Sequence, residues 1–347
     1  MTRTSLQVIE PQAARWDAFV AAHPRGHLLQ ISAWGELKAA FGWQPARVAL
    51  EDLNTGALVA GAQMLLRRWP LGKLAYVPFG PVVDWAQAEH IDVLMDALHR
   101  AAQAHGAGFT LFEPGFDVPQ ATLRAAGLSP SPHTIQPPNT ILLTLDDEAA
   151  ILKRMNQGTR RNIRKAEKAG VTIREATRAD LASFNAMLGA TGDRQAFGVH
   201  APEYYEKAYE LFVPSGAAAL LLASAEGEDL AGVFVFKCGT GAWYLYGASR
   251  DAQREKRAAF GVQWAGVQWA LAHGCRTYDM VGVPDAAPAT LEDEFETRSD
   301  GLWGVYRFKR GWGGAVRRTV GAWYAGYTPL AYTAYNVGLR ARRWLRR

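Results

Sequence analysis

The stretch ALAHG at residues 270–274 closes an apolar helical pattern, and AQAHG at residues 102–106 closes a second one. Each is followed by a short apolar strand pattern that ends in an acid, Asp279 or Glu113. Further pairs precede them in the same order at offsets of about 170 residues: Ala60-Gly61 with Ala231-Gly232, and Tyr76 and Gly80 with Tyr244, Tyr246 and Gly247. Ordered matches predict a duplicated α/β unit, although alanine-rich strand–turn–helix–strand sequences also resemble one another by chance.

The patterns around these matches predict a mixed α/β (α+β) fold. Apolar and alternating stretches predict strands, helical spacing predicts helices, and proline and glycine mark turns. The expected strands are 47–50, 58–66, 73–77 and 109–113, and the expected helices are 12–22, 27–41, 89–105 and 146–170. The stretch SPSPHTIQPPN at residues 129–139 is expected to be a linker, because its prolines exclude regular structure.

The composition is typical of a globular protein, since 49% of the 347 residues are hydrophobic and 20% are charged. This length is sufficient for two domains. No apolar run is long enough to span a bilayer, and the first ten residues, MTRTSLQVIE, lack the apolar run of a signal peptide. These features predict a cytoplasmic protein. Cys238 and Cys275 indicate neither a disulfide framework nor a metal site.

Basic residues gather in two separate regions, although the net charge is only +5. Residues 315–347 contain seven arginines and no acid, interleaved with tryptophan and tyrosine, as in a segment that lies at a membrane interface. A tRNA-binding tail and a packing helix are the alternatives. The other region is the predicted helix 146–170, whose spacing puts Arg154, Arg161, Lys165 and Lys168 on one face. Such a face is either solvated or faces phosphates, and the scarcity of acids favours phosphates.

The stretch WGVYRFKRGWGG at residues 303–314 is expected to form a short strand, 305–308, followed by a glycine-rich turn. Lys309 stands where the strand meets the turn. A cation beside flexible backbone is suited to hold a negative charge. The alternative is a hairpin edge with a solvated lysine.

Motifs for covalent, metal or redox catalysis are absent from the sequence. It contains no GxSxG elbow, Walker loop, HExxH or CxxC, and its eight histidines show no ligand spacing. We therefore expect no metal and no cofactor. Direct transfer between two bound substrates remains compatible with the sequence.

Four stretches of the chain resemble the FemABX (Fem) family of aminoacyl-tRNA-dependent transferases. They are QISAWGELKAAFGW (30–43), YVPFGPVVDW (76–85), LKRMNQGTRRNIRKAEKAGV (152–171) and YDMVGVP…GLWGVYRFKRGWGG (278–314). The resemblance implies two tandem GNAT-like (acetyltransferase-fold) domains with mixed sheets. Residues 1–145, completed by 311–347, would form domain 1, and residues 146–310 would form domain 2. The chain lacks the heptads of the family's coiled-coil arm and is similar to the shorter, FemX-like type.

The reaction that this resemblance implies is transfer of glycine, alanine or serine from aminoacyl-tRNA to a peptidoglycan precursor. The acceptor would be the side-chain amine of the third stem residue of a UDP-MurNAc-peptide or a lipid-linked precursor, which the enzyme meets in the cytoplasm or at the inner face of the membrane. A non-catalytic tRNA-binding module is one alternative. A CoA-dependent N-acyltransferase is another, but residues 254–261 lack the glycine pattern of a CoA loop.

Candidate site residues follow from matching the family's motifs to this chain. Lys309, with Phe308 beside it, is expected to stabilise the oxyanion or the terminal ribose, and Lys38 and Arg194 to grip a diphosphate. Asp84 is expected to anchor the acceptor amine, with a helix N-cap as the alternative. Tyr76, Tyr244 and Tyr246 are expected to line the cleft. The residues expected to contact tRNA phosphates are Arg154, Arg161, Arg164, Lys165 and Lys168.

Overall fold

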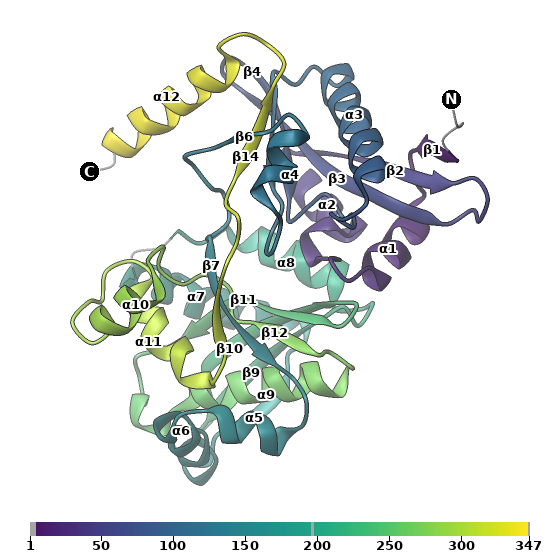
Figure 1. Ribbon diagram of the computed structural model, residues 1–347. Helices are drawn as coiled ribbons and strands as arrows, with labels where there is room; N and C mark the ends of the chain where they lie inside the picture. The colour runs from purple at the N-terminus through teal and green to yellow at the C-terminus, as the bar shows by residue number, and fades with distance from the viewer. Residues whose placement is uncertain (1–4, 196–197, 346–347) are drawn as a thin grey trace. The chain divides into compact units, whose positions relative to one another are not determined.

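The computed structural model describes residues 5–195 and 198–345, with the side chains of 193–195 and 341–345 outside the description. The chain divides into two compact units, each with its own sheet (Figure 1). Unit 1 comprises Met1–Gln136 and Arg318–Arg347, and unit 2 comprises Pro137–Arg317. The C-terminal segment thus returns to the unit that contains the N-terminus.

Unit 1 is built on a seven-stranded sheet of order β1-β2-β3-β4-β5-β14-β6. Its strands are β1 (Leu6–Ile9), β2 (Gln44–Asp52), β3 (Leu58–Trp69), β4 (Gly72–Pro78), β5 (Phe109–Glu113), β6 (Ser129–Pro130) and β14 (Trp323–Gly326). Its helices are α1 (Ala13–Ala22), α2 (Ser32–Ala39), α3 (Ala88–Ala104), α4 (Gln120–Ala125) and α12 (Ala331–Leu345), with a 3-10 turn at Leu28–Gln30.

Unit 2 repeats this plan with the order β13-β7-β12-β11-β10-β9-β8. Its strands are β7 (Asn139–Thr144), β8 (Thr172–Glu175), β9 (Ala218–Ala225), β10 (Glu228–Cys238), β11 (Gly241–Ser249), β12 (Thr277–Asp279) and β13 (Ala315–Arg318). Its helices are α5 (Glu148–Arg154), α6 (Gln157–Lys168), α7 (Leu181–Gln195), α8 (Pro202–Phe212), α9 (Ala258–Ala272), α10 (Pro288–Glu294) and α11 (Trp303–Lys309), with 3-10 turns at Arg178–Asp180, Arg254–Lys256 and Arg310–Trp312.

The two sheets share one strand arrangement, which confirms the predicted mixed α/β class. In each, an antiparallel run leads to a parallel pair that a helix connects, β4–α3–β5 in unit 1 and β11–α9–β12 in unit 2. An antiparallel strand from another part of the chain then flanks that pair, β14 beside β5 and β7 beside β12. Parallel pairing needs a helical crossover, and this is what the repeated helix–glycine–strand pattern encodes.

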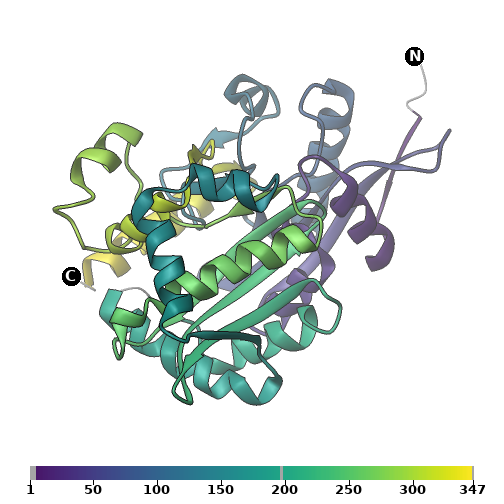
Figure 2. The same cartoon turned by 90° about the horizontal axis from the view of Figure 1, so that it is seen from below.

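Helices cover both faces of the sheet of unit 2. Helix α9 is apolar on all sides and packs over β9 and β10 (Figure 2), as expected of a buried helix. Helix α6 covers α9 in turn. On the opposite face, Phe184 of α7 and Phe212 of α8 contact the rings of Phe234 and Phe236. The central strands of this sheet are therefore buried between two helical layers.

Three sequence expectations are wrong. Residues 305–308 belong to helix α11 and not to a strand, because burial of Trp303, Tyr306 and Lys309 follows a three-residue spacing. The predicted helix 146–170 is interrupted at Met155, and the side chain of Asn156 starts α6 as its N-cap. The linker contains a two-residue strand, β6, because Pro130 lies at a sheet edge where no amide donor is needed.

Candidate functional site

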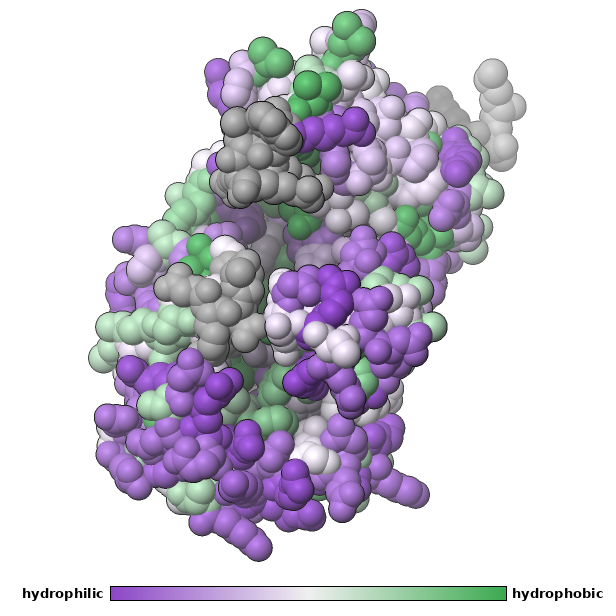
Figure 3. Space-filling model, turned by 90° about the vertical axis from the view of Figure 1, so that its left-hand side faces the viewer, coloured by the Kyte–Doolittle hydropathy of each residue, from purple (hydrophilic) through white to green (hydrophobic). Residues whose placement is uncertain are grey.

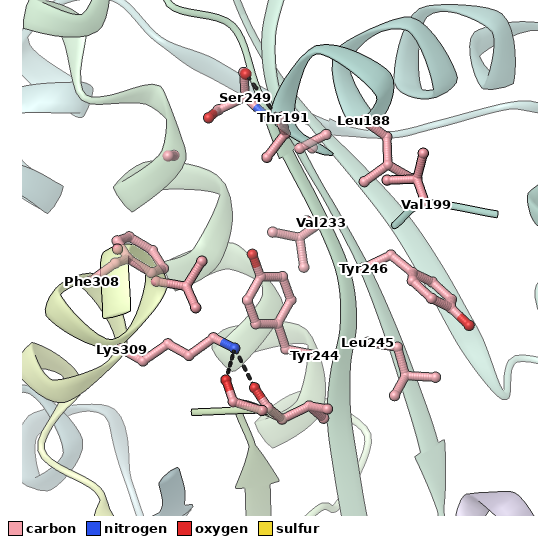
Figure 4. Close-up of a pocket in the computed structure, with 18 of the residues that line it drawn as sticks. Leu188, Thr191, Val199, Val233, Tyr244, Leu245, Tyr246, Ser249, Phe308 and Lys309 are labelled. Carbon is pink, nitrogen blue, oxygen red and sulfur yellow. Dashed lines mark hydrogen bonds between the residues drawn. The ribbon is translucent and has the colours of Figure 1, made fainter. Parts of the chain in front are cut away.

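A pocket of ≈480 Å³ opens in unit 2 where β11 and β12 part. Parallel pairing joins only Gly241–Trp243 of β11 to Thr277–Asp279 of β12. From Tyr244 onward β11 continues without β12, and side chains from β11, α7, α9 and α11 enclose the space (Figure 4). The connection between β12 and α11 supplies Val281, Gly282 and Leu302 to the wall.

Lys309 enters this pocket from the last turn of α11 and is only 8% exposed. Its ammonium donates hydrogen bonds to the carbonyl oxygens of Val281 and Gly282, the latter at 2.9 Å (Figure 4). Its nitrogen also lies 5.7 Å from the ring centroid of Tyr244. An ammonium has three donors, so after these two bonds to the backbone a third N–H remains for a ligand.

A strained loop aims the two carbonyls at Lys309. Val281 has φ +48° and Gly282 has φ +56°, and the left-handed region is costly for a β-branched residue such as valine. The carboxylate of Asp279 fixes the loop, because it accepts hydrogen bonds from the amide of Val281 at 2.7 Å and from the hydroxyl of Thr140. The two carbonyl oxygens of the loop therefore take the place of the water molecules that would solvate the ammonium of Lys309 if it were exposed.

Burial shifts the protonation of both charged groups in this region. It lowers the pKa of Lys309 to about 8, while the nearby charge of Asp279 opposes that shift. Burial also raises the pKa of Asp279, against the hydrogen bonds from Thr140 and Val281 and the charge of Lys309. A lysine with a lowered pKa in a pocket is a candidate for catalysis or for anion binding.

Tyr244 shares the pocket with Lys309, and a glycine makes room for it. A Cβ added to Gly247 would lie 1.7 Å from the hydroxyl oxygen of Tyr244. The register between β10 and β11 skips Leu245, so that Tyr244 and Gly247 lie on the same face of the sheet. Burial raises the pKa of Tyr244 to about 12, which keeps the phenol protonated at neutral pH.

Tyr246 and Phe308 occupy different parts of this region. The ring of Tyr246 points away from Lys309 (Figure 4), toward Tyr204 and Tyr205 on α8. Its hydroxyl lies 3.4 Å from that of Tyr204. Phe308 lines the pocket and packs against Phe260 and Trp312. Lys309, Phe308, Tyr244 and Tyr246 all line the pocket, but the ring of Tyr246 packs against Tyr204 and Tyr205 and not beside Lys309.

Lys38 lies in unit 1, at the end of α2, in a second cationic region. Its nitrogen is 4.7 Å from the ring centroid of Trp34. Burial and the charge of Arg67 lower its pKa to about 8. The guanidinium of Arg67 in turn lies 5.1 Å from the ring centroid of Trp43. The two cations lie close enough for the charge of Arg67 to act on Lys38, and paired cations suit the binding of a phosphate, which makes this pair a candidate phosphate site.

Sequence reasoning missed Arg67. Its signal was the pair Arg67-Arg68 at the end of a strand, just before the hairpin turn. Cations near a turn are common, however, and only the tertiary fold shows that Arg67 reaches Lys38 and Trp43.

Tyr76 is committed to a buried network in unit 1. Its hydroxyl donates to the carboxylate of Glu113 and accepts from the side-chain amide of Gln136 at 3.3 Å. Glu113 also accepts from the backbone amides of Ile135 and Gln136. Burial raises the pKa of Tyr76 well above its usual value, and that of Glu113 as well. The network ties the segment before β7 to the end of β5.

For Asp84 the structure shows a local hydrogen bond, and for Arg194 it describes the backbone alone. Asp84 is exposed, and its carboxylate accepts from the amide of Ala86 at 3.0 Å. It caps this turn and not α3, whose N-cap is Gln87. Arg194 lies in the last turn of α7, and its side chain is outside the described part of the chain. Their proposed contacts with substrate stay predictions.

The basic face predicted for residues 154–168 is divided between two helices. Arg154 ends α5 and forms a bidentate ion pair with Asp146 at 2.6 and 2.7 Å, so the expectation that it shares a face with Lys165 is wrong. The exposed cations of α6 are Arg161, Arg164, Lys165 and Lys168. Figure 3 shows hydrophilic residues over the lower end of the face it draws, the end where Figure 1 draws α5 and α6.

Neither a metal centre nor a membrane-spanning helix is found among the described residues. Within 5–195 and 198–345, no three histidine, cysteine or acidic side chains are grouped to hold a metal ion. Over the same residues, no helix combines the length and hydropathy needed to cross a bilayer.

Comparisons with known proteins identify relatives of the whole chain. The model of the FemAB family matches residues 12–134, 126–230 and 224–338. The Lipid II:glycine glycyltransferase of Staphylococcus saprophyticus is 25% identical over 398 aligned positions, which cover 92% of this chain and 93% of the relative. The protein of the same name from Staphylococcus aureus is 25% identical over 386 positions, with coverages of 88% and 89%. These alignments have more positions than this chain has residues, so the relatives contain stretches that it lacks.

Solved structures show the same fold. The crystal structure of FemX superposes with a TM-score of 0.85 at 22% identity, over 94% of this chain and 99% of that one. A tandem GNAT protein from the clavulanic acid biosynthesis pathway superposes with a TM-score of 0.53 at 14% identity, over 93% and 99%. The predicted pair of GNAT-like folds is therefore confirmed.

Proposed function

The chain belongs to the FemAB family, and from this premise we propose that it is an aminoacyltransferase of peptidoglycan synthesis. It moves an amino acid from aminoacyl-tRNA to the side-chain amine of the third stem residue of a precursor. Glycine is proposed over alanine and serine, and a lipid-linked acceptor over a UDP-linked one, because relatives across the whole chain are named Lipid II:glycine glycyltransferases.

The observation that carries the proposal is the buried ammonium of Lys309 in the pocket of unit 2. In the reaction, the neutral amine attacks the ester carbonyl carbon, a C–N bond forms, the C–O bond to the ribose breaks, and the proton that the nitrogen loses is balanced by the proton that the ribose hydroxyl gains. The ester is already activated, so the enzyme needs no nucleophile of its own. Negative charge develops on the carbonyl oxygen, and a preorganised donor at that point lowers the barrier. Lys309 has one N–H left for this oxygen after its bonds to Val281 and Gly282.

The other predicted residues receive proposed roles in unit 1 and unit 2. Phe308 and Tyr244 form the pocket wall beside the ammonium. Lys38 is proposed to bind the diphosphate of the acceptor, with Arg67 as its neighbour and Arg194 as a further ligand. Asp84 is proposed to attract the acceptor's amine, and Tyr76 to hold the fold behind Lys38 through Glu113.

Aminoacyl-tRNA is the proposed donor, and the exposed cations of α6 are its proposed phosphate contacts. Four cations within eight residues, Arg161 to Lys168, are accompanied by a single acid, Glu167. Such a surface binds polyanions with a steep dependence on salt. The protein is proposed to work in the cytoplasm at the inner face of the membrane, with residues 315–347 in contact with lipid.

Substitution of Lys309 by methionine tests the proposal. We expect Lys309→Met to reduce transfer of glycine from Gly-tRNA to lipid-linked precursor roughly 10²–10³-fold, because one oxyanion donor is removed. The product is measured by mass. Lys237→Met, in β10 and outside the pocket, is the matched control and should retain activity. Full activity of Lys309→Met, or tRNA binding by the wild type without transfer, would refute the proposal.

A further inference from the structure

One edge of the surface of unit 1, at the β3–β4 hairpin and the start of α12, carries large apolar side chains that are exposed to solvent. Among the described residues, four large apolar side chains are at least 60% exposed: Leu71, Leu330 and Val337 on the β3–β4 hairpin and by α12, and Leu53 at the separate β2–β3 turn. Leu71 is the tip of the β3–β4 hairpin and is 70% exposed, and Leu330 precedes α12 and is 77% exposed. Exposure of single apolar residues is ordinary, but a group of them marks an interaction surface.

The hairpin tip and the start of α12 lie side by side. The ring centroids of Trp69 and Tyr335 are 5.7 Å apart. The amide of Gly108 donates to the carbonyl of Lys73 at 2.8 Å, and the carbonyl of Gly108 accepts from the amide of Thr328 at 3.0 Å. Leu71 and Leu330 therefore flank one strip of backbone. Figure 3 shows hydrophobic residues among hydrophilic ones at the upper end of its face, where Figure 1 draws α12 and the turn before β4.

The backbone of Leu330 begins α12, since its carbonyl accepts a hydrogen bond from the amide of Ala334 at 2.8 Å, but the side chain takes no part in the core. Its φ is +61°, in the left-handed region that disfavours a leucine. The strain is not offset by burial, because most of the side chain is in water. An apolar residue that is both strained and exposed is a candidate for function.

The two segments that form this strip carry charge of one sign. The sequence has no acid between Asp52 and Asp84, and none after Asp300. Arg68 lies on the hairpin and Arg340 on the exposed side of α12, three residues after Val337. Basic residues beside aromatic and aliphatic ones are the composition of surfaces that lie in the headgroup region of an anionic bilayer.

We propose that this edge, formed by the β3–β4 hairpin tip and the start of α12, docks on an anionic lipid bilayer with Leu71 and Leu330 inserted between headgroups. The proposal deepens the proposed function, since it names the surface that brings the enzyme to a lipid-linked acceptor. A second copy of the chain and tRNA are the rival occupants, and the tests below exclude them if the proposal holds.

Vesicle sedimentation of the full chain tests the docking. Wild type should bind phosphatidylglycerol–phosphatidylcholine vesicles, and bind less well to phosphatidylcholine alone or at raised salt. Leu71→Asp should lower the partition coefficient roughly tenfold or more, because it places a charge at the position where the proposal inserts a leucine into the bilayer. Leu53→Asp, at the β2–β3 turn and 60% exposed, is the matched control and should bind like wild type.

Leu330→Gly separates docking from folding. Glycine suits φ +61°, so the variant should unfold at the same or a higher temperature while its vesicle binding falls. Wild type that ignores anionic vesicles, Leu71→Asp and Leu330→Gly variants that bind like wild type, or a Leu53→Asp variant that binds as poorly as they do would overturn the proposal. So would a dimer in light scattering that Leu71→Asp dissociates, or tRNA that competes with vesicles for this edge.

Transfer in the absence of a bilayer distinguishes the two proposals. Leu71→Asp and Leu330→Gly should retain the wild-type rate with the lipid-linked precursor dispersed in detergent and lose it when the same precursor is held in vesicles. Wild type that binds vesicles through this edge but transfers no amino acid would refute the proposed function and leave the docking surface standing. Wild type that transfers but does not bind vesicles would do the reverse.

Discussion

Lys309 is a charged side chain at a place that water hardly reaches. Carbonyl oxygens of Val281 and Gly282 stand in for water, and the left-handed conformations of these residues aim them at the ammonium. The same burial lowers the pKa of Lys309 to about 8. The residue that we propose for catalysis therefore titrates within the range in which enzymes are assayed.

Transfer should fall as pH rises through about 8. Only the ammonium form of Lys309 stabilises an oxyanion, and it loses its proton above its pKa, which burial lowers to about 8. The rate constant kcat/KM measured against pH checks this. In Lys309→Arg the guanidinium remains charged, so whatever activity survives should lack this decline. An unchanged decline in Lys309→Arg would contradict the assignment.

Gly247→Ala should damage both stability and transfer. The new methyl group would overlap the hydroxyl of Tyr244, which lies 1.7 Å from its position. Overpacking of this kind costs about 1–3 kcal/mol in free energy of unfolding, measured by denaturant titration. Addition of Tyr244→Val should restore stability but not transfer. Gly189→Ala in α7, with nothing within 4 Å, is the control and should cost nothing.

At the level of elements, the break between α5 and α6 separates an ion-paired arginine, Arg154, from the solvent-exposed cations of α6. Asn156 caps α6, and the chain turns between Arg154 and the cations that follow. Arg154 then pairs with Asp146 and holds the start of this region together. The cations from Arg161 to Lys168 on α6 face solvent instead. One of the five residues expected to contact tRNA is thus committed to the fold.

Binding of tRNA should depend on α6 and little on Arg154. Arg161→Ala and Lys165→Ala should each weaken affinity and lower the slope of log K against log salt by roughly one for each phosphate that the side chain neutralises. Filter binding at several salt concentrations measures the slope. Arg154→Ala is the matched control, since its charge is already paired. Equal decreases in all three variants would show that α6 is not the surface that binds tRNA.

At the level of the molecule, each sheet is completed by a strand from elsewhere in the chain. Strand β14 pairs with β5 more than two hundred residues earlier, with Trp323 opposite Phe112. Trp323 is 1% exposed. The sheet of unit 1 is therefore complete only when β14, which follows unit 2 in the chain, has paired with β5.

Truncation should reveal this dependence. A chain that ends at Gly321 lacks β14 and leaves the edge of β5 unpaired, so we expect unit 1 to unfold or aggregate. A chain that ends at Gly338 keeps β14 and the first half of α12, and should fold. Thermal unfolding and light scattering compare the two. A stable, monomeric shorter chain would contradict the role of β14.

The duplicated α/β plan can be predicted from the amino-acid sequence alone, since the helix–glycine–strand pattern of α3 and α9 encodes a crossover wherever it occurs. The family can be predicted as well, through residues 30–43, 76–85, 152–171 and 278–314. Packing in three dimensions makes 303–309 a helix, because burial of Trp303 and Tyr306 outweighs the strand propensity of their neighbours. Packing also places Arg67 beside Lys38 and turns Tyr246 away from Lys309. Local patterns report periodicity along the chain, whereas such neighbours are set by register and bulges between strands that lie far apart in sequence.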